Sequence, residues 1–179
     1  MILFRNDRKD KNVDRLVWKI QKFKDLGIDE LYDLLKLRAD VFVVEQNSAY
    51  PDLDGKDRHR DTVHLTARTE GKRLAAYLRI LAPGISYPDP SFGRVVVAPE
   101  FRNQGISHTL VKKALSLIRV QWPGRAVTIG AQVYLENFYG LHGFVPLSKA
   151  YVEDGIPHID MKRLPQKGED PGAGIPDSP

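Results

Sequence analysis

Apolar positions along the chain predict a succession of strands and helices. Strands are expected at residues 16–20, 63–69, 74–81, 95–97 and 127–131, since each is short and rich in aliphatic or aromatic residues. Helices are expected from Asp29, which can cap a first turn, from Thr109, and over residues 135–142. Turns at residues 70–72 and 153–156 close two hairpins, the second formed by residues 144–152 and 158–163. The pattern predicts one α/β core without an internal repeat.

The stretch from Val95 to Ser107 joins a strand to a helix through small residues. The strand ends before Pro99, which lacks the N–H that a strand ladder needs. The first N–H groups of a helix have no partner within it, and the helix dipole adds about half a positive charge, so a diphosphate fits there. Gly105 lets the backbone approach such a ligand; alternatively, it only permits a positive φ in an ordinary joint.

A second motif follows a strand that ends at Gln132. It reads Tyr134-Leu-Glu-Asn-Phe-Tyr139-Gly-Leu-His-Gly-Phe144. Together with Arg102-x-x-Gly-x-Ser107 it resembles the two signatures of GNAT-type N-acetyltransferases, Arg/Gln-x-x-Gly-x-Gly/Ala and Leu/Phe-Tyr-x-x-x-Gly-Phe. Ser107 departs from the first signature, but its side chain is small enough to leave the cradle open.

Five further segments narrow the resemblance to the ElaA family of this superfamily. They are Arg38-Ala-Asp-Val-Phe-Val-Val-Glu-Gln46, Tyr50-Pro-Asp-Leu-Asp54, Ala76-Tyr-Leu-Arg-Ile80, Gly93-Arg-Val-Val-Val97 and Glu153-Asp-Gly-Ile-Pro-His158. The resemblance covers residues 16–163 and implies the GNAT fold, of class α/β (α+β). That fold has a mixed, mostly antiparallel central sheet of about six to seven strands flanked by helices, with two strands splayed apart to hold acetyl-CoA.

Composition is ordinary for a soluble globular protein: of 179 residues, 42% are hydrophobic and 28% charged. The absence of cysteine excludes disulfides, thiolate metal sites and a cysteine nucleophile, and it agrees with a reducing cytoplasm. The N-terminal apolar run is too short for a signal peptide, and no segment is long enough to span a membrane. We therefore expect a cytoplasmic protein without a membrane partner.

Charge is concentrated near the N-terminus, where residues 1–24 hold eight Lys and Arg against three Asp, within a net charge of +4. Such a run could contact nucleic acid, but it is usually a solvated face, so no nucleic-acid partner is expected. The chain is divided into a polar basic leader (1–15), a single domain (16–163) and a flexible Pro- and Gly-rich tail (164–179). A homodimer is compatible with the sequence, which does not give the oligomeric state.

The resemblance implies that acetyl-CoA binds as a cosubstrate, mainly through backbone groups. Pantetheine would lie as a pseudo-strand between the strands at Val95 and Val127. The N–H near Val97 would polarise the thioester carbonyl, an interaction worth about 3 kcal/mol per donor. The residues implied at this site are Val95, Val96, Val97, Arg102, Asn103, Gln104, Gly105, Ile106, Ser107, Gln132, Asn137 and Tyr139.

Tyr139 is the candidate general acid. It occupies the Tyr position of the Tyr-x-x-x-Gly-Phe signature, and a phenol with an ordinary pKa of about 10 stays protonated at neutral pH. It could therefore protonate the departing CoA thiolate. Alternatively, its ring only fills space beside Phe138 and Phe144.

A proton must also leave the attacking amine, because only a neutral amine is a nucleophile. Glu45 and His158 would both face the acceptor cleft in the GNAT fold, and His64 is a third candidate. A lone His in a strand is, however, more often structural than catalytic. His108 and His142 lie on helices beside the motifs and are expected to be incidental.

Arg38, Arg79 and Arg94 fall in predicted helix or strand and therefore need carboxylate partners, which Asp52, Asp54 or Glu45 could provide. Such pairs would form either a buried structural network, which we favour, or a clamp for an anionic substrate. The residues expected near the acceptor are Arg38, Glu45, Gln46, Asp54, His64, Arg79 and His158.

No metal is expected. Asp52, Asp54 and Asp57 resemble part of a calcium loop, but the Gly and the distal Glu of that loop are not in register. No other group of His, Asp and Glu has the spacing of metal ligands.

The sequence thus predicts a GNAT-type transferase that moves an acetyl group from acetyl-CoA to a primary amine by direct attack within a ternary complex. One alternative is a longer acyl donor, since Arg38-x-x-Val-Phe also resembles a run in acyl-homoserine-lactone synthases. Another is a non-catalytic CoA-binding or interaction module, against which the presence of Tyr139 argues. The acceptor itself is not identified by the sequence.

Overall fold

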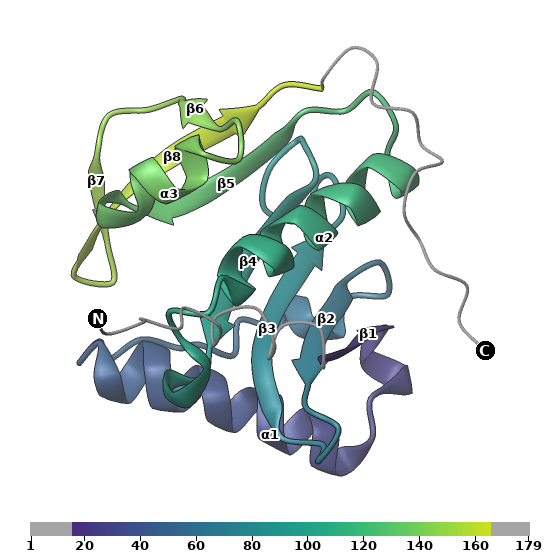
Figure 1. The fold of residues 1–179 in the computed structure, drawn as a ribbon. Coiled ribbons are helices and arrows are strands. Elements are labelled where there is room, and N and C mark those ends of the chain that lie inside the picture. Colours follow the sequence, from purple (N-terminus) through teal and green to yellow (C-terminus); the bar gives the residue numbers. More distant parts are fainter. Residues whose placement is uncertain (1–15, 166–179) are drawn as a thin grey trace, which may run out of the picture.

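The computed structural model describes residues 16–165. The predicted leader (1–15) and residues 166–179 of the predicted tail therefore lie outside the described residues. Within the described chain, eight strands form two sheets, and three α-helices pack around them (Figure 1).

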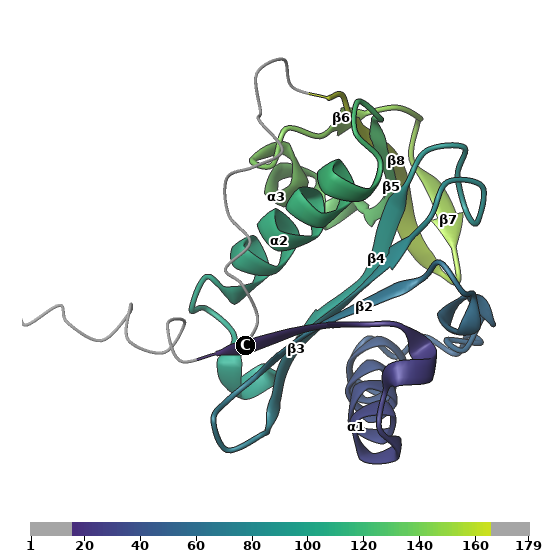
Figure 2. The same ribbon diagram turned by 90° about the vertical axis from the view of Figure 1, so that its right-hand side faces the viewer.

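The first sheet is antiparallel and follows the order β1–β2–β3–β4, with β1 at Val17–Gln21, β2 at Val63–Arg68, β3 at Leu74–Leu81 and β4 at Ser91–Val97. The helices α1 (Ile28–Arg38) and α2 (Ile106–Gln121) lie on opposite sides of this sheet (Figure 2). Because both faces are covered, β2 and β3 are buried almost throughout, and this includes the polar side chains of His64, Thr66 and Arg79. The predicted hairpin of residues 63–69 and 74–81 is confirmed.

The second sheet is built around β8 (Ile156–Arg163). Strand β5 (Val127–Gln132) pairs with it on one side, and β6 (Val145–Pro146) and β7 (Tyr151–Glu153) pair with it as well, all antiparallel. The predicted strand 144–152 is wrong in its extent: residues 147–150 leave the ladder, because Ser148 Oγ accepts from the backbone N–H of Asp160 in place of a strand carbonyl. Short helix α3 (Glu136–Gly140) packs beside this sheet (Figure 1).

Strands β4 and β5 begin side by side and then part. Thr128 N donates to Pro90 O at 3.2 Å, just where β4 begins, but no ladder continues between the two strands in the part of the chain described. The predicted splay between these strands is thereby confirmed, and it divides the predicted central sheet into two. The gap opens toward the C-terminal ends of both strands, beside the start of α2.

Both long helices begin earlier than their apolar periodicity suggested. Helix α1 starts after Gly27, whose N–H donates to the Glu30 carboxylate at 3.2 Å, rather than at a cap formed by Asp29. Beyond Arg38 the chain continues in a wider, π-helical segment, Ala39–Glu45, in which Gln46 N donates to Val41 O at 3.1 Å. Helix α2 begins at Ile106, directly after Gly105.

Candidate active site

Two cavities meet at the gap between β4 and β5. The helix-side cavity, of about 570 Å³, lies among β4, the start of α2 and α3. The loop-side cavity, of about 530 Å³, lies among the loop that follows the π-helical segment, β4, β5 and the β7–β8 turn. The residues that border both cavities are Phe42, Gln46, Val95, Gln132, Leu135 and Tyr139. A ligand that extends from one cavity into the other must pass this shared wall.

The helix-side cavity contains most of the residues expected to bind acetyl-CoA. Val95, Val96 and Val97 border it from β4, and Arg102, Asn103, Gly105, Ile106 and Ser107 border it from the start of α2. Gly105 has a φ of +75°, and no atom lies within 4 Å of the place where a Cβ would be, so the helix N-terminus is open there. Gln104 and Asn137 do not border the cavity; the Gln104 side chain donates instead to Glu100 O.

A bulge in β4 lies on the wall of the loop-side cavity. Tyr77 pairs with Val96 and Arg79 pairs with Gly93, so Leu78 faces two residues of β4, and one of them, Arg94, has a φ of +55°. A bulge of this kind leaves one residue unpaired in the ladder. Backbone polar groups of β4 are therefore freed next to the junction of the cavities.

Arg102 is bound by Glu45. Its Nη1 and Nη2 donate to the Glu45 carboxylate oxygens at 2.9 and 2.8 Å, and its Nε donates to Val97 O at 3.2 Å. The bond to Arg102 lowers the pKa of Glu45 and raises the pKa of Arg102. Glu45 borders the helix-side cavity but not the loop-side cavity, so it lies on the side expected for the cofactor and not in the acceptor cleft.

Tyr139 borders both cavities from α3. Its ring is 5% exposed and packs against Phe138 at 5.0 Å, Phe144 at 6.0 Å and Phe92 at 6.2 Å between centroids. Burial raises the pKa of Tyr139 above its ordinary value, so the hydroxyl stays protonated at neutral pH. The ring therefore fills space, as one interpretation expected, and also belongs to the wall where an acyl group and an amine could meet.

His158 borders the loop-side cavity from β8. Its Nδ1 lies 2.9 Å from Ile156 O, and since a carbonyl oxygen only accepts, Nδ1 carries the hydrogen. In the neutral ring, Nε2 is then the nitrogen with a free lone pair. The ring stacks on Tyr151 with 6.2 Å between centroids and an angle of 25°.

Three arginines and three aspartates form a network beneath the loop-side cavity, in which Arg38, Arg79, Asp52 and Asp57 are buried and Arg94 and Asp54 are partly exposed. The ion pairs join Arg38 to Asp52 (2.9 Å) and Asp57 (2.8 Å), Arg79 to Asp54 (2.7 Å) and Asp57 (2.9 Å), and Arg94 to Asp52 (2.7 Å) and Asp54 (3.6 Å). Desolvation would raise the pKa of Asp54, but the hydrogen bond and charge of Arg79 outweigh it and lower the pKa to about 2. The favoured structural network is therefore present, with Asp57 as an unforeseen member in place of Glu45.

His64 is part of the same buried structure. Its Nε2 lies 3.0 Å from Asp57 O and its Nδ1 lies 2.8 Å from the Tyr77 hydroxyl, so Nε2 donates and Nδ1 accepts. Burial lowers the pKa of His64, which keeps the ring neutral. Arg38 and His64 are fully buried and border neither cavity, so the direct substrate contacts expected of them are not available; Asp54 and Arg79 do border the loop-side cavity.

An amide pair closes the wall between the cavities. Gln132 Nε2 donates to Gln46 Oε1 at 3.1 Å, and Gln46 Nε2 lies 3.5 Å from Gln132 Oε1. Nearby, Ser48 Oγ donates to Asp154 O at 2.9 Å. These contacts join the segment after α1 to the second sheet. Two further residues of the loop-side cavity, Tyr87 and Gly130, belong to no motif and give no signal in the sequence.

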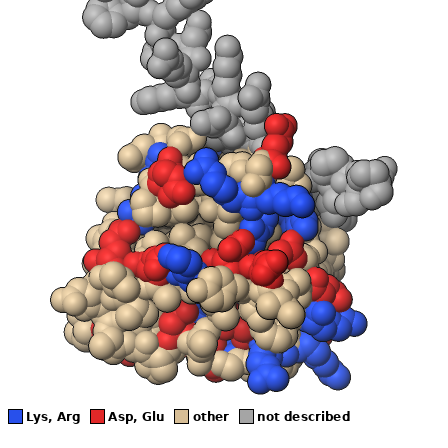
Figure 3. Space-filling model, turned by 90° about the horizontal axis from the view of Figure 1, so that it is seen from below, with Lys and Arg blue, Asp and Glu red and all other residues tan. Residues whose placement is uncertain are grey.

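The described surface gives no indication of a metal or a membrane span. Among residues 16–165, no three His, Asp or Glu side chains are grouped so that they could hold a metal ion, and no helix there combines the length and apolarity needed to cross a bilayer. On the face seen in Figure 3, Lys and Arg side chains alternate with Asp and Glu. This face does not present the single-sign stripe typical of nucleic-acid binding.

The sequence and the fold are similar to those of known proteins. The model of the acetyltransferase (GNAT) domain family matches residues 39–165. Protein ElaA of Escherichia coli (strain K12) is 40% identical over 146 residues, which cover 82% of this chain and 95% of that protein. A crystal structure of an acyl-CoA N-acyltransferase from Pseudomonas aeruginosa is 43% identical, with a TM-score of 0.79, over 83% of this chain and 99% of that one.

A more distant structure shares the fold alone. The CoA-dependent acyl-homoserine lactone synthase BjaI, solved with SAM and isopentyl-CoA, is 19% identical, with a TM-score of 0.67, over 85% of this chain and 84% of that one.

Proposed function

We propose, on the premise that this chain belongs to the GNAT acetyltransferase superfamily and within it to the ElaA family, that it transfers an acetyl group from acetyl-CoA to a primary amine. The coarser activity, transfer of an acyl group from an acyl-CoA to nitrogen, follows from the family. The observation that carries the proposal is the meeting of two cavities at one wall that contains Tyr139. One cavity suits the donor and the other suits the acceptor.

The donor is assigned to the helix-side cavity. The open N-terminus of α2 at Gly105 offers backbone N–H groups to the diphosphate, and Arg102 offers a cation beside it. Pantetheine then runs along Val95–Val97 toward the gap between β4 and β5. The thioester reaches the shared wall.

The transfer itself needs only positioning and proton movement. The neutral amine attacks the thioester carbon, and a backbone N–H near Val97 stabilises the negative oxygen of the tetrahedral intermediate. When the C–S bond breaks, Tyr139 donates its proton to the CoA thiolate. The tyrosinate is later reprotonated from solvent. No covalent enzyme intermediate is required, in keeping with a chain that contains no cysteine.

We assign the removal of the amine proton to His158, directly or through water. Its Nε2 is the free nitrogen of a ring that borders the loop-side cavity. Glu45 fits this role less well, because its carboxylate lies on Arg102 and has a lowered pKa.

A longer acyl donor is the second candidate. The relative from Pseudomonas aeruginosa is named for acyl-CoA rather than acetyl-CoA, and the fold neighbour BjaI was solved with isopentyl-CoA. A non-catalytic CoA-binding module would keep the helix-side cavity but would have no use for Tyr139 at the shared wall.

Calorimetric titration with acetyl-CoA, isopentyl-CoA and CoA tests the donor. We expect acetyl-CoA to bind the wild type and not a Gly105→Glu variant, which places bulk and negative charge at the open helix N-terminus. A Gly105→Asn variant is the matched control, since Asn tolerates the same positive φ without adding charge. Absence of binding by folded wild type would contradict the proposal, and tighter binding of isopentyl-CoA would favour the longer donor.

A further inference from the structure

A carboxylate and two tyrosines lie together beside the loop-side cavity. Asp160 of β8 is paired with Gly130 of β5 in the ladder. Its Oδ1 accepts a hydrogen bond from the Tyr87 hydroxyl at 2.7 Å and another from the Tyr151 hydroxyl at 2.9 Å. Tyr87 reaches this point from the loop between β3 and β4, 73 residues away along the chain.

Tyr87 and Gly130 border the loop-side cavity, and the half-buried Tyr151 and Asp160 lie directly behind them. Gly130 is exposed and borders the loop-side cavity. A Cβ at this position would lie 3.0 Å from the Tyr87 hydroxyl oxygen, 3.3 Å from that of Tyr151 and 3.7 Å from Asp160 Oδ1. A side chain here would therefore press against the Tyr87 hydroxyl, so the glycine is what lets these oxygen atoms lie so close to β5. We call the space bordered by Tyr87, Gly130, Tyr151 and Asp160 the notch.

The notch offers hydrogen-bond acceptors and no donor. Each tyrosine hydroxyl has one hydrogen, and both hydrogens point to Asp160, so only oxygen lone pairs remain. A ligand group that fits must itself donate hydrogen bonds. An ammonium group does so, whereas a carboxylate, which only accepts, does not.

The charge of the notch is also unmatched. Across residues 16–165, no ion pair includes Asp160, and its neighbour Lys162 binds Asp89 at 2.9 Å. In the adjacent network, Arg38, Arg79 and Arg94 are balanced by three aspartates. Lys56 also borders the cavity, and its ammonium group donates to Ser86 Oγ at 2.8 Å.

We propose that the notch binds a second, non-reacting ammonium group of the acceptor, so that the substrates are diamines. This inference rests on the proposed function, since it takes the loop-side cavity as the acceptor site. Gly130 and Gln132 lie on the same face of β5, two residues apart, which places the notch about 7 Å from the shared wall, a span of roughly four or five methylene groups. One nitrogen reacts beside Tyr139 while the other is held at the notch.

NMR titration of the full chain tests the notch independently of catalysis, because it measures millimolar affinities without turnover. The probes are 1,5-diaminopentane, pentylamine and 6-aminohexanoic acid. We expect the diamine to bind about tenfold more tightly than the monoamine, as one hydrogen bond to a charged group would give. The backbone amides of Gly130 and Asp160 should shift with the diamine.

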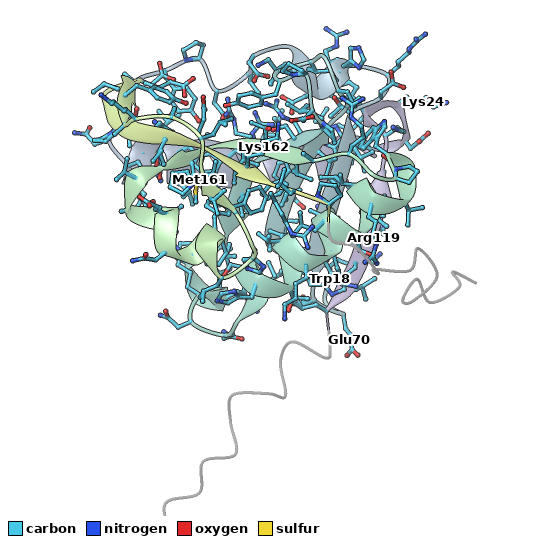
Figure 4. All side chains as sticks on the ribbon, turned by 90° about the horizontal axis from the view of Figure 1, so that it is seen from above. Trp18, Lys24, Glu70, Arg119, Met161 and Lys162 are labelled. Atoms are coloured by element: carbon cyan, nitrogen blue, oxygen red, sulfur yellow. The ribbon has the colours of Figure 1, made fainter. Side chains whose placement is uncertain are left out.

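Two variants remove the notch in different ways. Asp160→Asn keeps the shape and removes the charge, and Gly130→Ala keeps the charge and fills the space; both should abolish the preference for the diamine. Glu70→Gln is the control, since Glu70 lies on the β2–β3 turn, far from Met161 and Lys162 of β8 (Figure 4), and should retain the preference. Thermal melting followed by circular dichroism checks that each variant is folded.

Equal affinities for diamine and monoamine in the wild type would overturn the inference, as would a preference for 6-aminohexanoic acid or a diamine preference that survives in both notch variants. The proposed function fails by a different measurement. If acetyl-CoA binds but the diamine is not preferred, only the proposed ammonium site at the notch is contradicted. If the diamine is preferred but acetyl-CoA does not bind, only the proposed acetyltransferase activity is contradicted.

Discussion

Glu45 and Arg102, 57 residues apart in sequence, bind each other through two parallel hydrogen bonds of 2.9 and 2.8 Å. Arg102 is the cation expected to meet the diphosphate of the donor. The Glu45 carboxylate therefore accepts hydrogen bonds from the same Arg102 N–H groups that a phosphate of the bound acyl-CoA would use. We therefore expect the Glu45–Arg102 pair to break or to shift when acyl-CoA binds.

The first prediction concerns that pair. Glu45→Gln should bind acetyl-CoA about threefold to tenfold more tightly, because it removes an anion that competes for Arg102 and repels phosphate. Calorimetry at low and moderate salt measures the effect, and Arg102→Gln should weaken binding instead. The turnover number of Glu45→Gln should stay within about twofold of wild type; a loss of about a hundredfold would identify Glu45 as the general base after all.

Removal of the Tyr139 hydroxyl should slow turnover. Tyr139→Phe keeps the ring and its contacts with Phe138 and Phe144, so the fold and the KM for acetyl-CoA should change little. The turnover number should fall about a hundredfold, since the CoA thiolate loses its proton donor. Steady-state kinetics with any accepted amine checks this. A variant that turns over at the wild-type rate would leave Tyr139 as a packing residue only.

His158 should be needed for removal of the amine proton. His158→Ala should lower the turnover number about a hundredfold, and free imidazole in the assay should restore part of it, because the vacated space borders the loop-side cavity. Imidazole added to wild type is the control and should have no such effect. A loss that imidazole leaves unchanged, together with a raised KM for the amine, would indicate binding rather than proton transfer.

The buried arginine network should dominate stability. Arg38→Met leaves Asp52 and Asp57 buried without one of their partners and should lower the free energy of unfolding by about 3–5 kcal/mol. Lys36→Met is the matched control on the same helix, since the pair of Lys36 with Asp40 is exposed to solvent and should add little to stability. Urea unfolding measures both. Similar costs for the two variants would show that the network adds nothing.

Stability should also fall on mild acidification because of His142. Burial first, and the neighbouring His108 next, lower the pKa of His142 from 6.5 to about 4. In the unfolded chain His142 binds a proton below about pH 6.5, but in the folded chain it does so only below about pH 4. The free energy of unfolding should therefore be highest above pH 6.5 and should decrease as the pH falls from 6.5 to 4. The slope should reach up to about 1.4 kcal/mol per pH unit.

Urea unfolding at several pH values between about 7 and 4 measures that slope. In His142→Asn it should be smaller by the contribution of one proton. His59→Asn, at an exposed position, is the control and should retain the wild-type slope. An unchanged slope in His142→Asn would mean that other groups cause the acid sensitivity.

The regular elements and most residues of the helix-side cavity could be predicted from the sequence, because their signals are local. The valines of β4, the apolar period of α2 and the glycine between them are read from neighbouring residues, and the structure brings them together around the helix-side cavity. The residues of the loop-side cavity could not be predicted in this way. Tyr87 and Gly130 meet Asp160 only through the pairing of β5 with β8 and the path of a loop, which no local pattern encodes.

Glu45 shows that a correctly recognised motif does not determine which cavity a side chain of that motif borders. The orientation expected for Glu45 comes from the family resemblance, whereas in the structure the chain after Arg38 winds as a π-helix that ends at Glu45. There Glu45 binds Arg102 and borders the helix-side cavity, not the loop-side cavity. The pairing of the three arginines with carboxylates, in contrast, was predicted correctly. A guanidinium that is removed from water is stable only when a carboxylate is bound to it.

The division into two sheets follows the order in which the chain is made. All strands of the first sheet lie between residues 17 and 97, and all strands of the second lie between residues 127 and 163. During synthesis the first sheet can therefore complete its hydrogen bonds, and α2 can cover it, before any strand of the second emerges from the ribosome. The shared wall combines Phe42, Gln46 and Val95 from the early part with Gln132, Leu135 and Tyr139 from the late part. A nascent chain is thus unable to assemble the shared wall until the segment that ends with Tyr139 has been translated.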